Sequence, residues 1–559
     1  MTTAFAQAPS ILSGRDRVHP VVAQNGMVSS QEALATEVGV SILRKGGNAV
    51  DAAVAVGFAL AVTLPRAGNL GGGGFMMIHN AETDRTVAID YRERAPAAAF
   101  RDMFLDEAGN ADSDKSRYSG LAIGVPGTVA GLALAHEKYG SGTLTLADLI
   151  APAIELADEG FPVSVDLAFS LATFAQRLQA DPDAARIFYP EGGGLFRPGD
   201  ILKQPDLAQS LKRIAVEGPD GFYRGPVAEA IAARVTELGG AMTPADLDDY
   251  EPVEREPVKG TYRGHEIYSM PPPSSGGVHI VQILNILEGF PIGYLGHNTA
   301  QTIHLMAEAM KRAYADRSAF LGDPDFVKVP VAGLISKDYA AELRNGISKN
   351  RSTPSASIRP GDPAPYEGEE TTHFSVVDKD GNAVSNTYTL NFSYGVRRIA
   401  TGTGILLNNE LDDFSAKPGI PNAYGLIGGE ANAVEPGKRP LSSMSPTLVF
   451  KDGRFLMATG SPGGSRIITT VLQIVMNVID HGMSVAEATH AVRIHHQWLP
   501  DEIRVETGLS GDTTRLLEQM GHTVTVKNAM GSTQSIFSGD GVLYGSSDPR
   551  RSGSLAAGH

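Results

Sequence analysis

Two adjacent threonines, Thr371 and Thr372, stand where a proline-rich stretch gives way to a predicted strand. The hydroxyl of a threonine inside a chain is a weak nucleophile. If the bond after Glu370 is cut, Thr371 gains an α-amine with a pKa of about 7.7–8.0, and this amine can take the proton of the hydroxyl. The junction therefore predicts a self-cleavage site and a nucleophile, although a Thr-Thr pair also opens many ordinary strands.

The segments on the two sides of this junction differ in composition. Residues 351–370 contain four prolines and little to bury, which predicts an exposed, mobile linker. Residues 371–377 and 383–390 are rich in β-branched and aromatic side chains and flank an Asp-Gly turn, which predicts a hairpin. In such a hairpin the numbers of opposed residues sum to about 760–762, so Thr371 lies opposite Thr389, Leu390 or Asn391.

Several short runs occur in a fixed order along the chain. The C-terminal third contains TTH at 371–373, GILLNNELDDF at 404–414, PLSSMSP at 440–446 and GSPGGS at 460–465. Further runs are GGNAVDAA at 46–53, GGGGF at 71–75, DYRE at 90–93 and GSTQS at 531–535. Together these runs closely resemble the γ-glutamyltranspeptidase family over nearly the whole length of the chain.

This resemblance implies a fold and a processing event. The expected fold is α+β, the four-layer αββα sandwich of N-terminal-nucleophile hydrolases. One precursor is expected to cut itself between Glu370 and Thr371, leaving residues 1–370 as a large subunit and residues 371–559 as a small catalytic subunit. Residues 351–370 are then the linker, and the two fragments remain together as a heterodimer in one fold.

The resemblance also assigns roles to individual residues. Thr371 attacks the γ-glutamyl amide, Thr389 holds its hydroxyl, and the N–H groups of Gly463 and Gly464 form the oxyanion hole. Glycine suits that position because no Cβ blocks the approach of the reacting oxygen. The expected substrate-binding residues are Arg92, Ser442 and Ser443 for the α-carboxylate, Asn391, Glu410 and Asp413 for the α-ammonium, and Tyr424 on a covering loop.

Three functions from different classes are open. The first is a γ-glutamyl transferase and hydrolase that acts on glutathione, glutamine-like amides and related donors, with water, amino acids or peptides as acceptors. The second is a cephalosporin or glutaryl acylase of the same fold, against which Asp413 argues because a glutaryl group has no ammonium. The third is an uncleaved, non-catalytic binding protein.

The composition excludes several classes of partner. The chain has 559 residues, of which 42% are hydrophobic and 20% charged, enough for a large core. Its net charge of −16 argues against nucleic acid and anionic membranes as partners. Because there is no cysteine, disulfides and thiolate nucleophiles are excluded. We therefore expect small-molecule partners.

Candidate cofactor and metal motifs are incomplete. The glycine-rich residues 68–74 are not followed by Lys-Ser or Lys-Thr, which argues against nucleotide binding. His136 has no second histidine four positions later, and the neighbours His495 and His496 would point apart. The sequence thus predicts no cofactor and no metal.

The N-terminal region predicts two consecutive helices. One begins at Ser29, with Glu32 completing a capping box, and ends near Gly46. The other, residues 49–64, is apolar but too short to cross a bilayer. Because the family is usually exported and residues 1–10 lack the features of a signal peptide, we expect a periplasmic or secreted protein whose signal peptide has been trimmed.

Overall fold

The computed structural model describes residues 17–360, 372–417 and 429–559. They form two seven-stranded sheets in which every neighbouring pair is antiparallel. From edge to edge the first sheet contains β1 (Val21–Ala23), β20 (Val542–Ser547), β19 (Gln534–Gly539), β15 (Arg454–Thr459), β14 (Thr447–Lys451), β9 (His265–Ser269) and β8 (Val258–Tyr262). The second contains β21 (Leu555–Gly558), β2 (Gly26–Ser30), β10 (Thr372–Asp378), β11 (Ala383–Thr389), β3 (Gly73–Asn80), β4 (Arg85–Tyr91) and β7 (Val253–Arg255).

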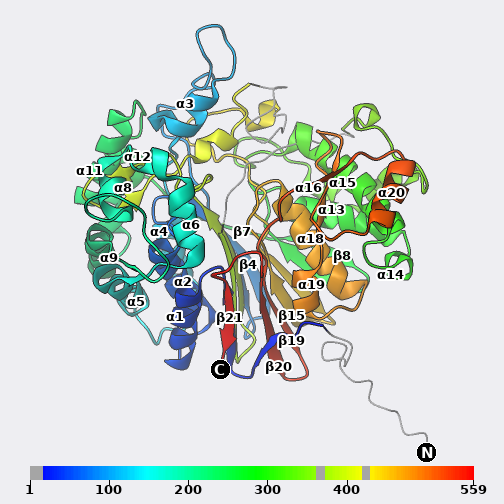
Figure 1. The fold of residues 1–559 in the computed structure, drawn as a ribbon, viewed down its shortest axis with the longest axis horizontal. Coiled ribbons are helices and arrows are strands. Elements are labelled where there is room, and N and C mark those ends of the chain that lie inside the picture. Colours follow the sequence, from blue (N-terminus) through cyan, green and yellow to red (C-terminus); the bar gives the residue numbers. More distant parts are fainter. Residues whose placement is uncertain (1–16, 361–371, 418–428) are drawn as a thin grey trace, which may run out of the picture.

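Helices cover the outer face of each sheet, so the layers run helix, sheet, sheet, helix (Figure 1). On the side of the second sheet lie α1 (Ala33–Arg44), α2 (Ala49–Thr63), α4 (Thr128–Tyr139), α5 (Leu146–Glu159), α6 (Val165–Thr173), α7 (Ala175–Leu178), α8 (Pro182–Phe188), α9 (Pro205–Glu217), α10 (Asp220–Tyr223), α11 (Gly225–Glu237) and α12 (Pro244–Asp248). On the side of the first sheet lie α13 (Gly276–Glu288), α14 (Ile292–Leu295), α15 (Ala300–Phe320), α16 (Val331–Leu334), α17 (Lys337–Asn345), α18 (Arg466–Ile479), α19 (Val485–His490) and α20 (Gly511–Gln519). The predicted α+β, four-layer αββα sandwich is confirmed.

Smaller elements complete the fold. They are α3 (Ser113–Tyr118), the pairs β5 (Phe161–Pro162) with β6 (Ile201–Leu202) and β12 (Ile399–Ala400) with β13 (Ile405–Leu406), and the sheet of β16 (Ile494–His495), β17 (Ile503–Val505) and β18 (Val524–Val526). The 3₁₀ turns are η2 (Gly120–Ala122), η3 (Ser355–Ser357), η4 (Glu410–Asp413) and η5 (Glu430–Asn432).

The alternation of side chains along a strand divides the core into layers. In the second sheet, Met77 and Val377 pack toward the first sheet, whereas Met76 and Val376 pack toward α1 and α2. Both faces are therefore buried, which explains why β10 and β11 have no exposed residue.

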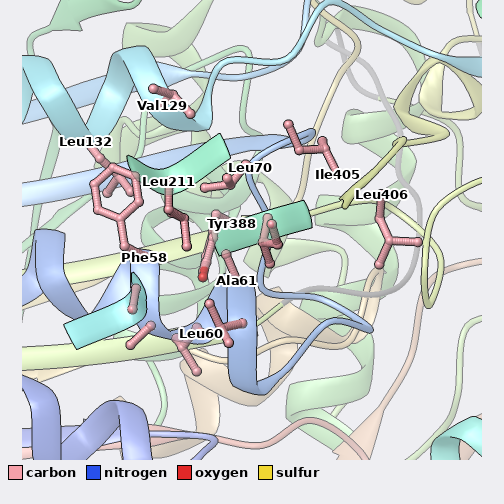
Figure 2. Close-up of a cluster of buried hydrophobic side chains, with 14 of the residues drawn as sticks. Phe58, Leu60, Ala61, Leu70, Val129, Leu132, Leu211, Tyr388, Ile405 and Leu406 are labelled. Carbon is pink, nitrogen blue, oxygen red and sulfur yellow. The ribbon is translucent and has the colours of Figure 1, made fainter. Parts of the chain in front are cut away.

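The apolar helix α2 is the centre of one outer layer. Every one of its residues is buried, and Asn48 and Asp51 close its N-terminus with a capping box. Figure 2 shows side chains of α2, α4 and α9 converging with Tyr388 of β11, whose hydroxyl donates to Gly57 O at 2.9 Å. The prediction of a buried helix at 49–64 is confirmed.

The preceding helix begins later than predicted. Ser29 belongs to β2, and α1 starts at Ala33 with Glu32 as its N-cap, whose carboxylate accepts from Ala35 N at 3.0 Å. The capping-box prediction at Ser29 was wrong because that serine pairs with Ser375 of the central hairpin strand, and strand pairing overrides the local helix signal.

The segment before the cleavage junction is partly anchored. Only residues 351–360 of the predicted linker are described, and there Ser355 is fully buried. Thr353 N donates to Glu308 Oε1 at 3.0 Å, and Ser355 N donates to Asp501 Oδ2 at 2.8 Å. Carboxylates on distant segments thus take up the backbone donors of Thr353 and Ser355, whereas residues 351–360 other than Ser355 and Ile358 are exposed or half-buried.

Candidate functional site

The far end of the central hairpin carries Thr389 and Asn391. The observed pairs, such as Thr372 with Tyr388, have numbers that sum to 760, as the turn at residues 380–381 predicted. Thr389 Oγ1 accepts from Asn391 N at 2.8 Å, so its own O–H serves as a donor. Asn391 has a φ of 71° and donates through Nδ2 to Asn409 O at 3.0 Å, which ties the hairpin end to the following segment.

The loop between β15 and α18 carries Gly463 and Gly464. Their φ angles of 134° and 57° lie in the left-handed region, which favours glycine. Gly464 is buried, and among the described residues neither glycine N–H has a hydrogen-bond acceptor. Buried N–H groups are nearly always paired, and these two shortly precede the N-terminus of α18, an arrangement that suits an anionic oxygen.

A buried histidine joins these two parts. The ring of His373 lies directly against Gly460, at the start of the glycine loop. Ser375 Oγ donates to Gln534 O at 2.9 Å and therefore accepts from His373 Nε2 at 3.1 Å. Nδ1 is then the acceptor from Thr387 Oγ1 at 2.8 Å, and burial lowers the pKa of His373 to about 3. This neutral ring is a spacer between the hairpin and the loop.

The acidic half of the site surrounds a single arginine. Arg92, directly after β4, is 1% exposed and forms ion pairs with Glu410 and Asp413 of η4. It also donates from Nε to Pro440 O and from Nη2 to Leu441 O, each at 3.1 Å. The arginine thus joins the acidic turn to the segment that carries the predicted serines.

The carboxylates of this half are not fully satisfied. Among the described residues, Glu410 Oε2 and Asp413 Oδ1 have no hydrogen-bond donor, and neither does the buried carboxylate of Glu93, which lies beside Glu410. Burial raises the pKa of Glu93 to about 7 even though Arg92 opposes this shift, and burial raises the pKa of Glu410 and Asp413 as well. These oxygens will either take up a proton or accept from a cationic ligand.

The serine half has the opposite polarity. Ser442 Oγ accepts from Met444 N at 3.1 Å, and Ser443 Oγ accepts from Nη2 of Arg317 at 3.0 Å. Because each oxygen already accepts from the protein, each O–H is left to donate. A pair of hydroxyl donors next to Arg92 suits a carboxylate ligand.

The structure thus brings together Arg92, Asn391, Glu410, Asp413, Ser442 and Ser443 through direct contacts and shared segments. Glu370, Thr371 and Tyr424 lie outside the described residues.

Sequence reasoning missed three residues of this site. Arg317 lies in the last turn of α15, 126 positions from the serine that it contacts, and Asn409 fixes the hairpin end by accepting from Phe392 N at 3.0 Å. Glu93 was noticed only as part of a run. The sequence did contain a signal for Arg317. Several charged residues of α15 recur at the spacing of one helical face, which indicates that a charged face of the helix packs against other charged or polar groups.

One described group has the composition of a metal site. His304, Glu308 and His522 offer ligand atoms within 4.8 Å of one another. However, His304 Nδ1 lies 2.7 Å from His522 Nε2, and Glu308 forms ion pairs with Lys311 and Arg312. Hydrogen bonds and two cations already occupy the ligand atoms. His495 and His496 do not converge, since His495 bonds to Thr469 and Gln497.

Comparison with known proteins identifies the family of this chain. The profile of the family described as Gamma-glutamyltranspeptidase matches residues 35–558. The glutathione hydrolase proenzyme of Escherichia coli strain K12 is 59% identical over 559 residues, which cover 100% of this chain and 96% of that protein. The acylase ACY 1 proenzyme of Pseudomonas sp. strain V22 is 40% identical over 548 residues, covering 96% and 94%.

A solved structure matches the whole fold. The cephalosporin acylase from Bacillus halodurans superposes with a TM-score of 0.87 at 29% identity, covering 100% of this chain and 99% of that one. Within the described ranges, no helix combines the length and apolarity that crossing a membrane requires. The family resemblance read from the ordered motifs is confirmed: the chain belongs to the γ-glutamyltranspeptidase family.

Proposed function

We propose that this chain is a γ-glutamyl transferase and hydrolase that acts on glutathione and related γ-glutamyl amides. One observation carries the proposal: buried carboxylate oxygens without donors among the described residues, on Glu410 and Asp413, lie across Arg92 from two serine hydroxyls that can donate. The α-carbon of a γ-glutamyl group bears both an ammonium and a carboxylate. It matches both halves of this site at once.

The reaction follows from the placement of the remaining groups. The Thr371 oxygen attacks the γ-carbonyl carbon while the α-amine of the same residue takes the hydroxyl proton. The negative oxygen of the tetrahedral intermediate accepts from the N–H groups of Gly463 and Gly464. The protonated amine then passes its proton to the leaving amine, and a γ-glutamyl ester remains on Thr371. Water or an acceptor amine releases the glutamyl group.

The role of Thr389 is supported by the register of the hairpin. The described pairs sum to 760, and extension of this register by one residue pairs position 371 with Thr389. The Thr389 hydroxyl, whose oxygen accepts from Asn391 N, then donates to the nucleophile oxygen and orients it. Tyr424 remains a proposed cover of the glutamyl site.

Processing is part of this proposal. A cut between Glu370 and Thr371 creates the α-amine that the reaction needs, and the fragments 1–370 and 371–559 remain associated. Amino acids and peptides are the proposed acceptors besides water, and the proposed location is the periplasm or the exterior of the cell. The similarity to a glutathione hydrolase proenzyme supports the precursor form.

The second candidate is an acylase for glutaryl-type side chains. Its support is the likeness to an acylase proenzyme and to a cephalosporin acylase structure. Against it stands the acidic half of the site, because a glutaryl group offers no cation to Glu410 or Asp413. The third candidate, an uncleaved binding protein, leaves the unpaired N–H groups of the glycine loop without a role.

Two measurements test the proposal. Intact-mass analysis of the wild type is expected to give two fragments that meet between Glu370 and Thr371, and Thr371→Ala is expected to give one chain without activity. Wild-type protein is also expected to hydrolyse γ-glutamyl anilide much faster than glutaryl anilide. An uncut chain with full activity, or a preference for glutaryl anilide, would overturn the proposal.

A further inference from the structure

A buried arginine on α15, in the helix layer over the first sheet, contacts the serine half of the site. Arg317 lies on α15 and is 1% exposed. Its Nη2 donates to Ser443 Oγ at 3.0 Å, and its Nε donates to Ser275 Oγ at 2.8 Å. Ser275 in turn donates from N and Oγ to Ser442 O, at 2.7 and 2.8 Å. One guanidinium thus holds both serines, Ser443 directly and Ser442 through Ser275.

The direction of these hydrogen bonds matters more than their number. A guanidinium has only donors, so Ser443 Oγ must act as acceptor toward Arg317. The single proton of Ser443 is then aimed elsewhere. Without Arg317 the hydroxyl could rotate and present a lone pair to the ligand, which would repel a carboxylate.

The charge of Arg317 also acts on the acidic half. Its positive charge favours the ionised form of Asp413, as the charge of Arg92 does. The two arginines come from different layers: Arg92 follows β4 of the second sheet, and Arg317 belongs to the helix layer over the first sheet. The anionic end of a ligand bound at the serines would therefore lie between cations from both sides.

We propose that Arg317 is a positioning residue that fixes the Ser443 hydroxyl as a hydrogen-bond donor, holds the backbone of Ser442 through Ser275, and thereby sets the preference for donors that carry an α-carboxylate. This inference rests on the proposed function. Arg317 lies outside every motif of the site, so its role is inferred from its contacts.

The test compares three anilides that differ only at the α-carbon. The γ-glutamyl anilide has both charges, the glutaryl anilide has only the carboxylate, and the γ-aminobutyryl anilide has only the ammonium. In Arg317→Met we expect KM to rise about 10- to 100-fold for the two donors with a carboxylate, as for loss of a hydrogen bond to a charged group. KM for the γ-aminobutyryl anilide and kcat for all three should change less than about threefold.

Coupling to the serine is tested by a double-mutant cycle. If Arg317 acts through Ser443, then Arg317→Met adds much less in the Ser443→Ala background than it does in the wild type. Arg317→Lys should recover part of the loss, because lysine keeps the charge and one donor. Effects that multiply fully across the cycle, or an equal loss of kcat for all three donors, would overturn the proposal.

A control on the same helix separates this role from folding. Arg312 is also buried. Its partners among the described residues are Glu308 and Gly346 O, and they do not include Ser442 or Ser443. Arg312→Met should lower thermal stability without changing the ratio of KM values. If wild type does not act on γ-glutamyl anilide at all, the proposed function fails; if wild type acts and Arg317→Met keeps its preference, only the present inference fails.

Discussion

Two buried ionic clusters in this molecule both pair glutamate with arginine, but with opposite effects on the pKa of the glutamate. The site cluster contains Arg92, Glu93, Glu410 and Asp413, and the anchor cluster contains His304, Glu308, Lys311, Arg312 and His522. In the anchor cluster, Glu308 Oε1 accepts from Lys311 and Thr353 N and Oε2 accepts from Arg312. Despite burial, Lys311 and these hydrogen bonds lower the pKa of Glu308 to about 2.

In the site cluster the balance is reversed. Three carboxylates share Arg92, several of their oxygens have no donor among the described residues, and burial raises the pKa of each. A buried carboxylate that is fully hydrogen-bonded stabilises the fold, whereas one without donors destabilises it until a ligand arrives. The difference between the clusters therefore separates a structural network from a binding site more clearly than residue type does.

The contrast between the two clusters is tested most strongly by removing the central carboxylate of each. Glu308→Ala leaves Lys311 and Arg312 buried without their anion, and we expect a loss of about 3–5 kcal/mol in the free energy of unfolding, measured with urea. Glu410→Gln removes a carboxylate that lacks a full set of donors, so its cost should stay below about 1 kcal/mol. Similar losses in both variants would refute the contrast.

The same contrast predicts the effect of acid. The folded-state pKa of Glu308 is about 2, below the ordinary 4.5, so its contribution to stability is present above pH 4.5 and is lost as the pH falls toward 2. Unfolding curves between pH 5 and pH 3 should show a smaller loss of stability in Glu308→Gln than in wild type.

A third prediction concerns ligand charge. Asp413→Asn keeps the shape of the side chain but removes the charge that we propose faces the donor ammonium. We expect kcat/KM for γ-glutamyl anilide to fall about 10- to 100-fold, as for a charged hydrogen bond, with little change for glutaryl anilide. An equal loss for both donors would show that Asp413 acts on the fold of η4 instead.

A fourth prediction is a pH dependence of specificity. Because the pKa of Glu93 is raised to about 7, this group is protonated below pH 7 and must lose its proton before the site can face an ammonium with full charge. The ratio of kcat/KM for γ-glutamyl to glutaryl anilide should therefore fall as the pH drops from 8 to 6. The ratio cancels the titration of the nucleophile, and in Glu93→Gln it should become flatter.

The smallest expected effect is that of added zinc or a chelator on the melting temperature. Since the ligand atoms of the anchor cluster are engaged by one another and by two cations, neither zinc nor a chelator should shift the melting temperature by more than about 2 °C. His522→Gln serves as the control. A zinc-dependent rise in melting temperature that this variant abolishes would turn the anchor cluster into a metal site.

How far the sequence predicts this molecule depends on the range of the contacts. The hairpin register follows from local turn chemistry and alternation, and the structure confirms it. The start of α1 does not follow from the local sequence, because Ser29 pairs with a strand residue more than 300 positions away. The binding residues near the motifs were found by resemblance, but Arg317 and Glu93 were not, since their roles arise from burial and contacts that no local pattern records.

The order of strands in the two sheets has a further consequence for the life of the protein. Each sheet combines strands from before residue 361 with strands from after residue 371, and strands of the two groups pair directly: β10 is hydrogen-bonded to β2, β11 to β3, β14 to β9 and β20 to β1. A single cut between those residues leaves every one of these ladders in place. To separate, the two fragments would have to break strand pairs in both sheets at once. We therefore expect a cleaved molecule to melt in one transition, and we expect that fragments made separately will not re-form it. Cleavage would thus break one covalent bond and leave the strand pairing of both sheets unchanged.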